Sequence, residues 1–165
     1  MEGLRPTPDR VRETLFNWLG QTLDGRRCLD LFAGSGALGF EACSRGATHV
    51  VMVEKSRTAF RALQESIKKI SCTNMVPHCE DGLEFVRREK NRYDVIFLDP
   101  PFHSDYLSKV MPLLVNLLTD EGVVYVESGE LFQLGSEWQV VKQAKAGKVH
   151  YQLCRPLSIT ASELR

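Results

Sequence analysis

The sequence lacks long apolar runs and an apolar start. No uninterrupted apolar stretch approaches the roughly 18 residues that a membrane-spanning helix requires. The chain begins Met1–Glu2–Gly3 and soon reaches prolines, so its start has no signal-peptide core. We therefore expect a cytoplasmic protein that has no membrane partner.

Cysteines are few and follow no pairing pattern. The chain has five, an odd number, and no two of them form a Cys-x-x-Cys pair. They are Cys28, Cys43, Cys72, Cys79 and Cys154. This scatter predicts neither a disulfide framework nor a zinc site, so we expect buried free thiols and no metal.

An excess of charge is also absent, because 21 lysines and arginines balance 21 aspartates and glutamates. A balanced chain exerts no overall attraction on nucleic acid, so any RNA-binding surface has to come from local clusters. The candidates are three arginines near the start and two lysines near the end, namely Arg5, Arg10, Arg12, Lys145 and Lys148. We expect no DNA partner.

Short apolar runs alternate with helical patterns along the chain, which is typical of repeated β-α units around a parallel sheet. With 165 residues, 43% of them hydrophobic, the chain fits a single domain over 1–165. We expect a leading helix at about 8–20, a nucleotide-binding core at about 27–135 and a C-terminal hairpin at about 138–155, with its loop at 144–148. Strands are predicted near 28–32, 49–53, 75–79, 93–98 and 122–127, and helices near 37–45, 56–70, 82–90 and 104–118.

The segment Tyr-Asp-Val-Ile-Phe-Leu-Asp-Pro-Pro-Phe at 93–102 ends an apolar strand abruptly. Pro100 and Pro101 cannot donate ladder hydrogen bonds, so they hold Asp99 and Phe102 at the carboxyl end of the strand. A carboxylate and a backbone carbonyl can both accept from one planar amino group, and an aromatic ring offers a face for stacking. The pattern indicates a nucleobase or a similar amide as ligand. The alternative is a strand-ending turn in which the acid is a cap.

A second pattern, Gly34-Ser35-Gly36 with Gly39, runs from an apolar strand into a helix. Glycines at this spacing let backbone N–H groups approach a ligand at the start of a helix. Glu54 ends the next apolar run, 20 residues after Gly34, where an acid can bind ribose hydroxyls.

Two further acids end strands on either side of this pattern. Asp30 closes the first strand, where a carboxylate would repel a pyrophosphate and attract an ammonium group. This favours an amino-acid-bearing nucleoside over NAD. Asp81 follows the third strand and precedes Gly82. It can accept the amino group of an adenine, or it can cap the helix that Gly82 begins.

These motifs together resemble a known family. The segment Asp30-Leu-Phe-Ala-Gly-Ser-Gly36 is similar to the cofactor loop of class I S-adenosylmethionine-dependent methyltransferases, and Asp99-Pro-Pro-Phe102 is similar to their catalytic tetrad. The leading segment 5–18, Arg-Pro-Thr-Pro-Asp-Arg-Val-Arg-Glu-Thr-Leu-Phe-Asn-Trp, resembles the RsmD family, which methylates the exocyclic N2 of one guanine in small-subunit (16S) ribosomal RNA. The resemblance covers about 4–155.

The resemblance implies a Rossmann-like α/β fold, with a mostly parallel seven-stranded sheet, an antiparallel C-terminal hairpin strand and helices on both faces. It implies S-adenosylmethionine as cofactor and small-subunit ribosomal RNA, within an assembled 30S particle, as partner. The implied catalytic residues are Asp99, Pro100, Pro101 and Phe102, and the implied cofactor-binding residues are Asp30, Gly34, Ser35, Gly36, Glu54, Asp81 and Gly82.

Family members also carry a basic segment ahead of the leading helix. Only Met1–Gly3 and the helix's own first residues stand here, so we expect part of the RNA-binding surface to be missing. Apart from the resemblance, the residues leave other classes open. These are a methyltransferase for DNA adenine, another RNA base or a protein glutamine, an NAD-dependent oxidoreductase, and a binding module without activity.

Overall fold

A computed structural model describes residues 9–100 and 105–157 of the chain. The expectations for Arg5, Pro101 and Phe102 lie outside these residues. Within the described ranges, no helix is both long enough and apolar enough to cross a membrane.

The core of the fold is one seven-stranded sheet with the strand order β3-β2-β1-β4-β5-β7-β6. Strands β1 to β5 pair in parallel, and β7 runs antiparallel to both of its neighbours. The strands are β1 (Arg27–Asp30), β2 (His49–Val53), β3 (Met75–His78), β4 (Tyr93–Leu98), β5 (Leu118–Ser128), β6 (Trp138–Ala146) and β7 (Val149–Pro156). The predicted sheet is confirmed.

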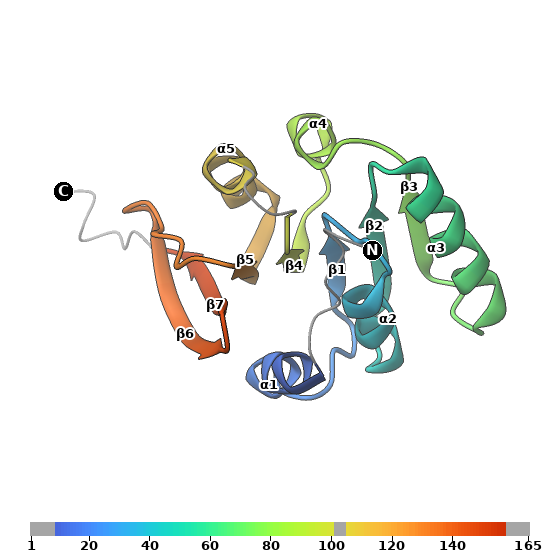
Figure 1. Ribbon diagram of the computed structural model, residues 1–165, viewed down its shortest axis with the longest axis horizontal. Helices are drawn as coiled ribbons and strands as arrows, with labels where there is room; N and C mark the ends of the chain where they lie inside the picture. The colour runs from blue at the N-terminus through green and yellow to red at the C-terminus, as the bar shows by residue number, and fades with distance from the viewer. Residues whose placement is uncertain (1–8, 101–104, 158–165) are drawn as a thin grey trace.

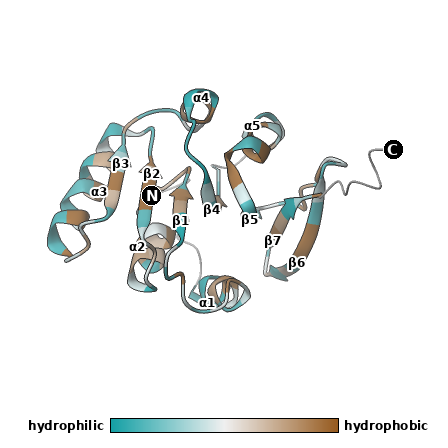
Figure 2. Cartoon of the chain, turned by 180° about the vertical axis from the view of Figure 1, so that it is seen from behind, coloured by the Kyte–Doolittle hydropathy of each residue, from teal (hydrophilic) through white to brown (hydrophobic). Residues whose placement is uncertain are grey.

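Helices cover both faces of this sheet, as predicted (Figure 1). They are α1 (Asp9–Trp18), α2 (Ala37–Ser44), α3 (Arg57–Lys69), α4 (Gly82–Arg88) and α5 (Tyr106–Leu114), followed by the 3-10 turn η1 (Val115–Leu117). One apolar cluster joins α1, α2 and α3 to one face, and a second joins α4 and α5 to the other. Figure 2 shows the apolar residues concentrated in the strands between these layers. Central strands buried on both faces explain the continuous apolar runs in the sequence.

The leading helix α1 packs against the middle of the sheet. Its residues Leu15 and Phe16 are completely buried, and the Phe16 ring lies 5.9 Å from the ring of Phe97 on β4. Trp18 stacks on Tyr151 of β7 at 5.2 Å. The helix therefore supports the same strands that carry the candidate catalytic residues.

The region between α5 and β5 differs from the prediction. The expected helix to 118 ends at Leu114 and continues as the 3-10 turn Val115–Leu117. Leu118 already pairs with Tyr93, and the register then shifts before Val123 pairs with Val95. Strand β5 therefore starts earlier than the predicted residue 122.

The C-terminal hairpin is confirmed, with a shorter loop than expected. Ala146 pairs with Val149, so only Gly147 and Lys148 form the turn. Gly147 has a φ of 60°, which suits a glycine at the first central position of a type II′ turn.

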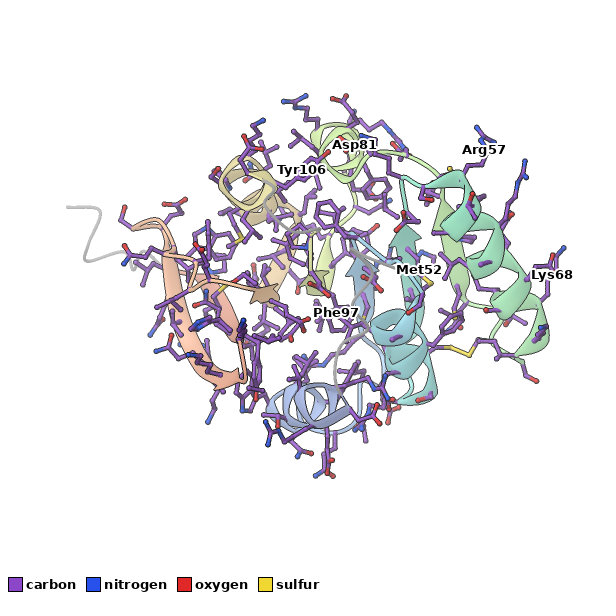
Figure 3. The ribbon with its side chains drawn as sticks, viewed as in Figure 1. Met52, Arg57, Lys68, Asp81, Phe97 and Tyr106 are labelled. Atoms are coloured by element: carbon purple, nitrogen blue, oxygen red, sulfur yellow. A yellow bond between two sulfur atoms is a disulfide. The ribbon has the colours of Figure 1, made fainter. Side chains whose placement is uncertain are left out.

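The prediction of five free thiols was wrong. Cys43, at the end of α2, forms a disulfide with Cys72, just after α3, across 29 positions in the sequence. The yellow bond in Figure 3 joins these two segments. Cys79 is free but exposed, whereas Cys28 and Cys154 are buried free thiols as expected. The pairing had no sequence motif, because it results from the packing of α2 beside α3 on one face.

Candidate active site at the carboxyl edge of the sheet

The strands β1 to β5 all end at one edge of the sheet, which we call the carboxyl edge. Asp30 is the last residue of β1, Glu54 follows β2, Asp81 follows β3 and Asp99 follows β4. Because β3, β2, β1 and β4 are neighbours in that order, these four acids lie along one edge. Ligands of open α/β sheets bind outside this edge.

The glycine loop connects β1 to α2 at the carboxyl edge. Gly34 and Gly36 have φ values of 55° and 87°, a left-handed conformation that favours glycine. A Cβ on Gly36 would lie 2.6 Å from side-chain atoms of Leu63 and Phe40, so the loop backbone is in close contact with the helices behind it. Ser35 is exposed between the two glycines. The Gly34 N–H donates to Glu54 and the Gly36 N–H donates to the Ala33 carbonyl, so Ser35 is the residue of this turn that is open to a ligand.

Asp30 is nearly completely buried, at 2% exposure. Its Oδ2 accepts a hydrogen bond from the Gly39 N–H at 3.2 Å, in the first turn of α2. Burial raises the pKa of Asp30 to about 7, and the nearby charge of Glu54 acts in the same direction. The carboxyl group thus fixes α2 to the end of β1, directly behind the glycine loop.

Glu54 holds the glycine loop from the side of β2. Its Oε1 accepts from the Gly34 N–H and its Oε2 accepts from the Ser56 N–H, both at 2.8 Å. Each carboxylate oxygen has two lone pairs, so both can accept a further hydrogen bond from a ligand hydroxyl. The sequence analysis predicted that Glu54 binds ribose hydroxyls, and it did not indicate these two backbone partners.

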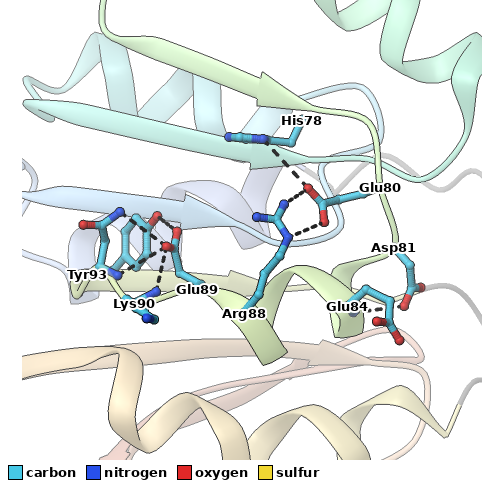
Figure 4. Close-up of polar contacts among 9 residues, drawn as sticks. His78, Glu80, Asp81, Glu84, Arg88, Glu89, Lys90 and Tyr93 are labelled. Atoms are coloured by element: carbon cyan, nitrogen blue, oxygen red, sulfur yellow. Dashed lines mark hydrogen bonds and ion pairs between the residues drawn. The ribbon is translucent and has the colours of Figure 1, made fainter.

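Asp81 has two partners within the protein. Its Oδ2 accepts from the Glu84 N–H at 3.2 Å and caps α4, which begins at Gly82 (Figure 4). Its Oδ1 accepts from the Tyr106 hydroxyl at 2.8 Å. Figure 3 shows Asp81 and Tyr106 close together where α4 and α5 meet. The capping alternative is confirmed, and Tyr106 is a neighbour that the sequence pattern did not indicate.

Asp99 lies beside a second acid that the sequence analysis missed. Leu98 pairs with Val126 in the parallel β4–β5 ladder, so the next residues, Asp99 and Glu127, are adjacent. Their side chains are hydrogen-bonded to each other. Glu127 is 7% exposed, and Asp99 is half-buried. The signal was present in the sequence, because the apolar run that ends β5 stops at an acid just as β2 and β4 do.

Burial and the neighbouring Glu127 raise the pKa of Asp99 well above its ordinary value, with a further contribution from Asp30. The Tyr125 hydroxyl donates to Glu127 Oε1 at 2.5 Å, and burial and Glu127 raise the pKa of Tyr125 as well. Burial and the neighbouring acid therefore favour the protonated form of the Asp99 carboxyl group.

Basic side chains of the hairpin reach the same edge. The last residue of β5, Ser128, pairs with His150, and His150 pairs on its other side with Lys145. Lys145 and Lys148 are exposed at the tip of the hairpin, next to the end of β5 that carries Glu127.

The arginines of α1 are placed differently. Arg10 is exposed, whereas the Arg12 guanidinium forms ion pairs with Asp9 at 2.7 Å and with Glu41 of α2 at 3.8 Å. Arg12 would have to exchange these partners to contact a phosphate. Among the described residues, no group of histidines, cysteines and acids has the arrangement of a metal site.

A sequence profile of the family described as "Conserved hypothetical protein 95", the RsmD family, matches residues 1–155. This chain belongs to that family. It is 39% identical over 160 residues to "Ribosomal RNA small subunit methyltransferase D" of Haemophilus influenzae, covering 92% of this chain and 83% of that protein. The protein of the same name from Escherichia coli is 38% identical over 156 residues, covering 92% and 79%.

Solved structures agree with this placement in the RsmD family. The yhhF protein of Escherichia coli superposes with a TM-score of 0.86 at 37% identity, covering 94% of this chain and 89% of that one. A Haemophilus influenzae structure superposes with a TM-score of 0.81, also at 37% identity, covering 93% of this chain and 100% of that one. The predicted Rossmann-like class I methyltransferase fold is confirmed.

Proposed function

We propose that this RsmD-family chain transfers a methyl group from S-adenosylmethionine to the exocyclic N2 of a guanine in small-subunit ribosomal RNA. The observation that carries the proposal is Asp99 followed by Pro100 at the carboxyl end of β4, next to the glycine loop on β1. The relatives named as small-subunit ribosomal RNA methyltransferases support the choice of RNA.

The carboxyl edge fits the parts of S-adenosylmethionine. The backbone of Gly34, Ser35 and Gly36 offers a close approach for the ligand. Glu54 can accept from ribose hydroxyls with the lone pairs that its backbone partners leave unused. Asp81, beside Gly82, can accept from the adenine amino group if the Tyr106 hydroxyl shares or leaves Oδ1.

Asp30 has a less direct role than the sequence suggested. Asp30 is only 2% exposed, so its carboxyl group has little surface for direct contact with a ligand. It would act on the cofactor's ammonium group mainly through its charge. Its bond to Gly39 also keeps the start of α2 in place. Asp30 therefore supports the loop that holds the cofactor.

S-adenosylmethionine supplies an electrophilic methyl group on a sulfonium ion. The protein has to orient the guanine amino group, whose lone pair is delocalised into the ring. An Asp99 oxygen and the Pro100 carbonyl can each accept a hydrogen bond from one of its two N–H groups, and Phe102 can stack on the base. Held in this way, the nitrogen faces the methyl group, and positioning and electrostatics provide most of the catalysis.

The RNA would reach this edge past the hairpin. Lys145 and Lys148 lie next to the end of β5, where they can bind phosphates close to Asp99. Arg10 offers a further exposed cation on α1. A surface of zero net charge needs shape complementarity to find one guanine, which favours the assembled 30S particle over naked RNA as substrate.

The proposal is tested with S-adenosylmethionine that carries a labelled methyl group. The acceptors are 30S particles lacking the modification, naked small-subunit ribosomal RNA, duplex DNA and a glutamine-containing peptide. We expect label in the ribosomal RNA, mainly from particles. Label in DNA or in the peptide alone would overturn the proposal. Thermal shift with S-adenosylhomocysteine against NAD tests the cofactor separately, because a ligand at about 100 times its Kd stabilises a fold by about 2.7 kcal/mol.

A further inference from the structure

The pairing of β4 with β5 places Glu127 beside Asp99, the candidate catalytic acid. Phe97 pairs with Tyr125 in the β4–β5 ladder, and Leu98 pairs with Val126. Two residues further along each strand from Phe97 and Tyr125 stand Asp99 and Glu127. Because side chains alternate between the faces of a sheet, all four lie on the α1 face. The Phe97–Tyr125 pair therefore lies directly next to the Asp99–Glu127 pair on this face.

Glu127 is buried and hydrogen-bonded on two sides. It accepts from the Tyr125 hydroxyl at 2.5 Å and shares a hydrogen bond with Asp99. Tyr125 is completely buried, and its ring contacts those of Phe97 at 6.5 Å and Tyr151 at 6.4 Å. Two carboxyl groups can form a hydrogen bond with each other only when one of them holds a proton, because carboxylates are acceptors only. The side-by-side placement of Asp99 and Glu127 at the ends of β4 and β5 therefore favours one proton shared between them.

We propose that Glu127 is a positioning residue for the methyl-transfer reaction, holding Asp99 through one shared proton and receiving that proton when the methylated amino group is deprotonated. This inference rests on the proposed function for its kinetic part. The pairing of the two acids stands independently of the substrate.

The proton transfer balances without a further reactant. Once the methyl–sulfur bond has broken and the methyl–nitrogen bond has formed, the nitrogen is positively charged. Its N–H bond breaks and an O–H bond forms on the outer oxygen of Asp99. At the same time the proton on the inner Asp99 oxygen moves to Glu127. The product amine is neutral, Asp99 is again protonated, and Glu127 has gained the proton and later releases it to water.

The groups around the pair favour a single proton on it. Asp30 on β1 adds negative charge, and Glu54 acts on Asp30 in turn. Tyr125 and Tyr151 contribute hydroxyl groups, and His150 precedes Tyr151 on β7. The residues of α1 that pack beneath, Phe16 and Trp18, do not titrate. Full ionisation of both acids would place two charges together beside a third, which is unfavourable.

The pairing is tested by carboxyl carbon-13 NMR of the free protein. The Asp99 resonance is assigned by its loss in Asp99→Asn. We expect the pKa of Asp99 in the wild type to lie well above that of an exposed aspartate. In Glu127→Gln the amide N–H donates to Asp99, so Asp99 should ionise at a lower pH. An Asp99 that titrates identically in both proteins would overturn the pairing.

The kinetic role is tested with the same variant. Glu127→Gln should lower kcat on the order of 100-fold, with the cofactor Kd unchanged within about threefold, and should remove the alkaline limb of the pH–rate profile. Tyr125→Phe should give a smaller loss in the same direction. Glu130→Gln, an exposed acid three residues on, is the matched control. Wild-type kcat and pH profile in Glu127→Gln would overturn the positioning role.

These two experiments separate the inference from the proposed function. If the wild type methylates no guanine, the proposed function fails, and the NMR titration still decides whether the acids share a proton. If guanine is methylated but Glu127→Gln titrates and turns over like the wild type, only the inference fails.

Discussion

At the scale of single residues, the acids of the carboxyl edge differ in their protein partners. Asp30 is buried against one backbone N–H, Glu54 accepts from two, and Asp99 is hydrogen-bonded to another acid. The same side-chain chemistry therefore has three consequences on substitution. Substitution of Asp30 should change how stability depends on pH. Substitution of Glu54 should remove the support of the glycine loop, and substitution of Asp99 should abolish turnover.

Asp30→Asn should change how stability depends on pH. The folded-state pKa of about 7 lies above the ordinary 3.8, so the stability that the protonated group contributes is complete below about pH 4 and is lost as the pH rises through 7. Asparagine does not titrate. From pH 4 to pH 8 the wild type should lose on the order of 4 kcal/mol relative to the variant, at about 1.36 kcal/mol per pKa unit. Urea unfolding across this range measures it, and parallel curves would contradict it.

Glu54→Gln and Asp99→Asn should separate cofactor binding from chemistry. Both oxygens of Glu54 accept from backbone N–H donors. In a glutamine at this position the side-chain NH₂ group would face one of these donors, which would then have no acceptor. The lost acceptor costs about 1–3 kcal/mol, which should weaken S-adenosylhomocysteine binding by about 5- to 150-fold. Asp99→Asn should abolish transfer while binding stays within a few-fold.

Titration calorimetry on both variants decides this assignment. Glu65→Gln, on the exposed side of α3, is the matched control for a lost negative charge. If Asp99→Asn lost the cofactor and Glu54→Gln kept it, the two roles would be reversed.

At the scale of elements, the carboxyl edge depends on how each helix begins. Helix α2 begins at the left-handed Gly36 without a side-chain cap, so its first turn bonds to Asp30 instead. Helix α3 is capped by Ser56, and α4 by Asp81. Asp81 therefore has two tasks that can be separated by mutation.

Asp81→Ala and Asp81→Ser should differ in stability but not in cofactor binding. Serine is as good an N-cap as aspartate, whereas alanine costs about 1 kcal/mol at this position. A serine hydroxyl lacks the second oxygen that the adenine amino group and Tyr106 would use. We expect Ser to be about 1 kcal/mol more stable than Ala, because it keeps the cap, and both variants to bind S-adenosylhomocysteine weakly. If Ser restored binding as well, Asp81 would be a cap only.

The sequence predicted the positions of these acids because an apolar run followed by an acid reliably indicates the carboxyl end of a buried strand. Asp30, Glu54 and Asp99 were located in this way, and Glu127 carries the same signal. The partners of the acids were not predictable. The contact of Asp81 with Tyr106 depends on how α4 and α5 meet, and the Cys43–Cys72 disulfide depends on the packing of two helices.

At the scale of the whole molecule, the net charge is zero, but basic side chains form local clusters. The hairpin places Lys145 and Lys148 at the carboxyl edge, beside the end of β5. The basic residues of α3, including Lys68, lie at the other end of the sheet, beside β3 (Figure 3). Lys145 and Lys148 are therefore the basic pair beside the end of β5 that carries Glu127, whereas Lys68 and Lys69 lie in the last turn of α3.

Replacing Lys145 and Lys148 together by alanine should weaken RNA binding and reduce its salt dependence. Each phosphate contact contributes a slope of about −0.7 in log affinity against log salt for single strands, so the slope should become shallower by about 1.4. The double substitution of Lys68 and Lys69 is the matched control. Filter binding at several salt concentrations measures both slopes. Equal changes in the two double variants would contradict a specific role of the hairpin.

The most direct test of the account is the identity of the methylated atom. Small-subunit particles are incubated with S-adenosylmethionine and either the wild type or Asp99→Asn, and the ribosomal RNA is digested to nucleosides for mass spectrometry against standards. The account predicts N2-methylguanosine with the wild type and none with Asp99→Asn. A methyl group on another base or on another atom of guanine, or equal product from the two proteins, would contradict it.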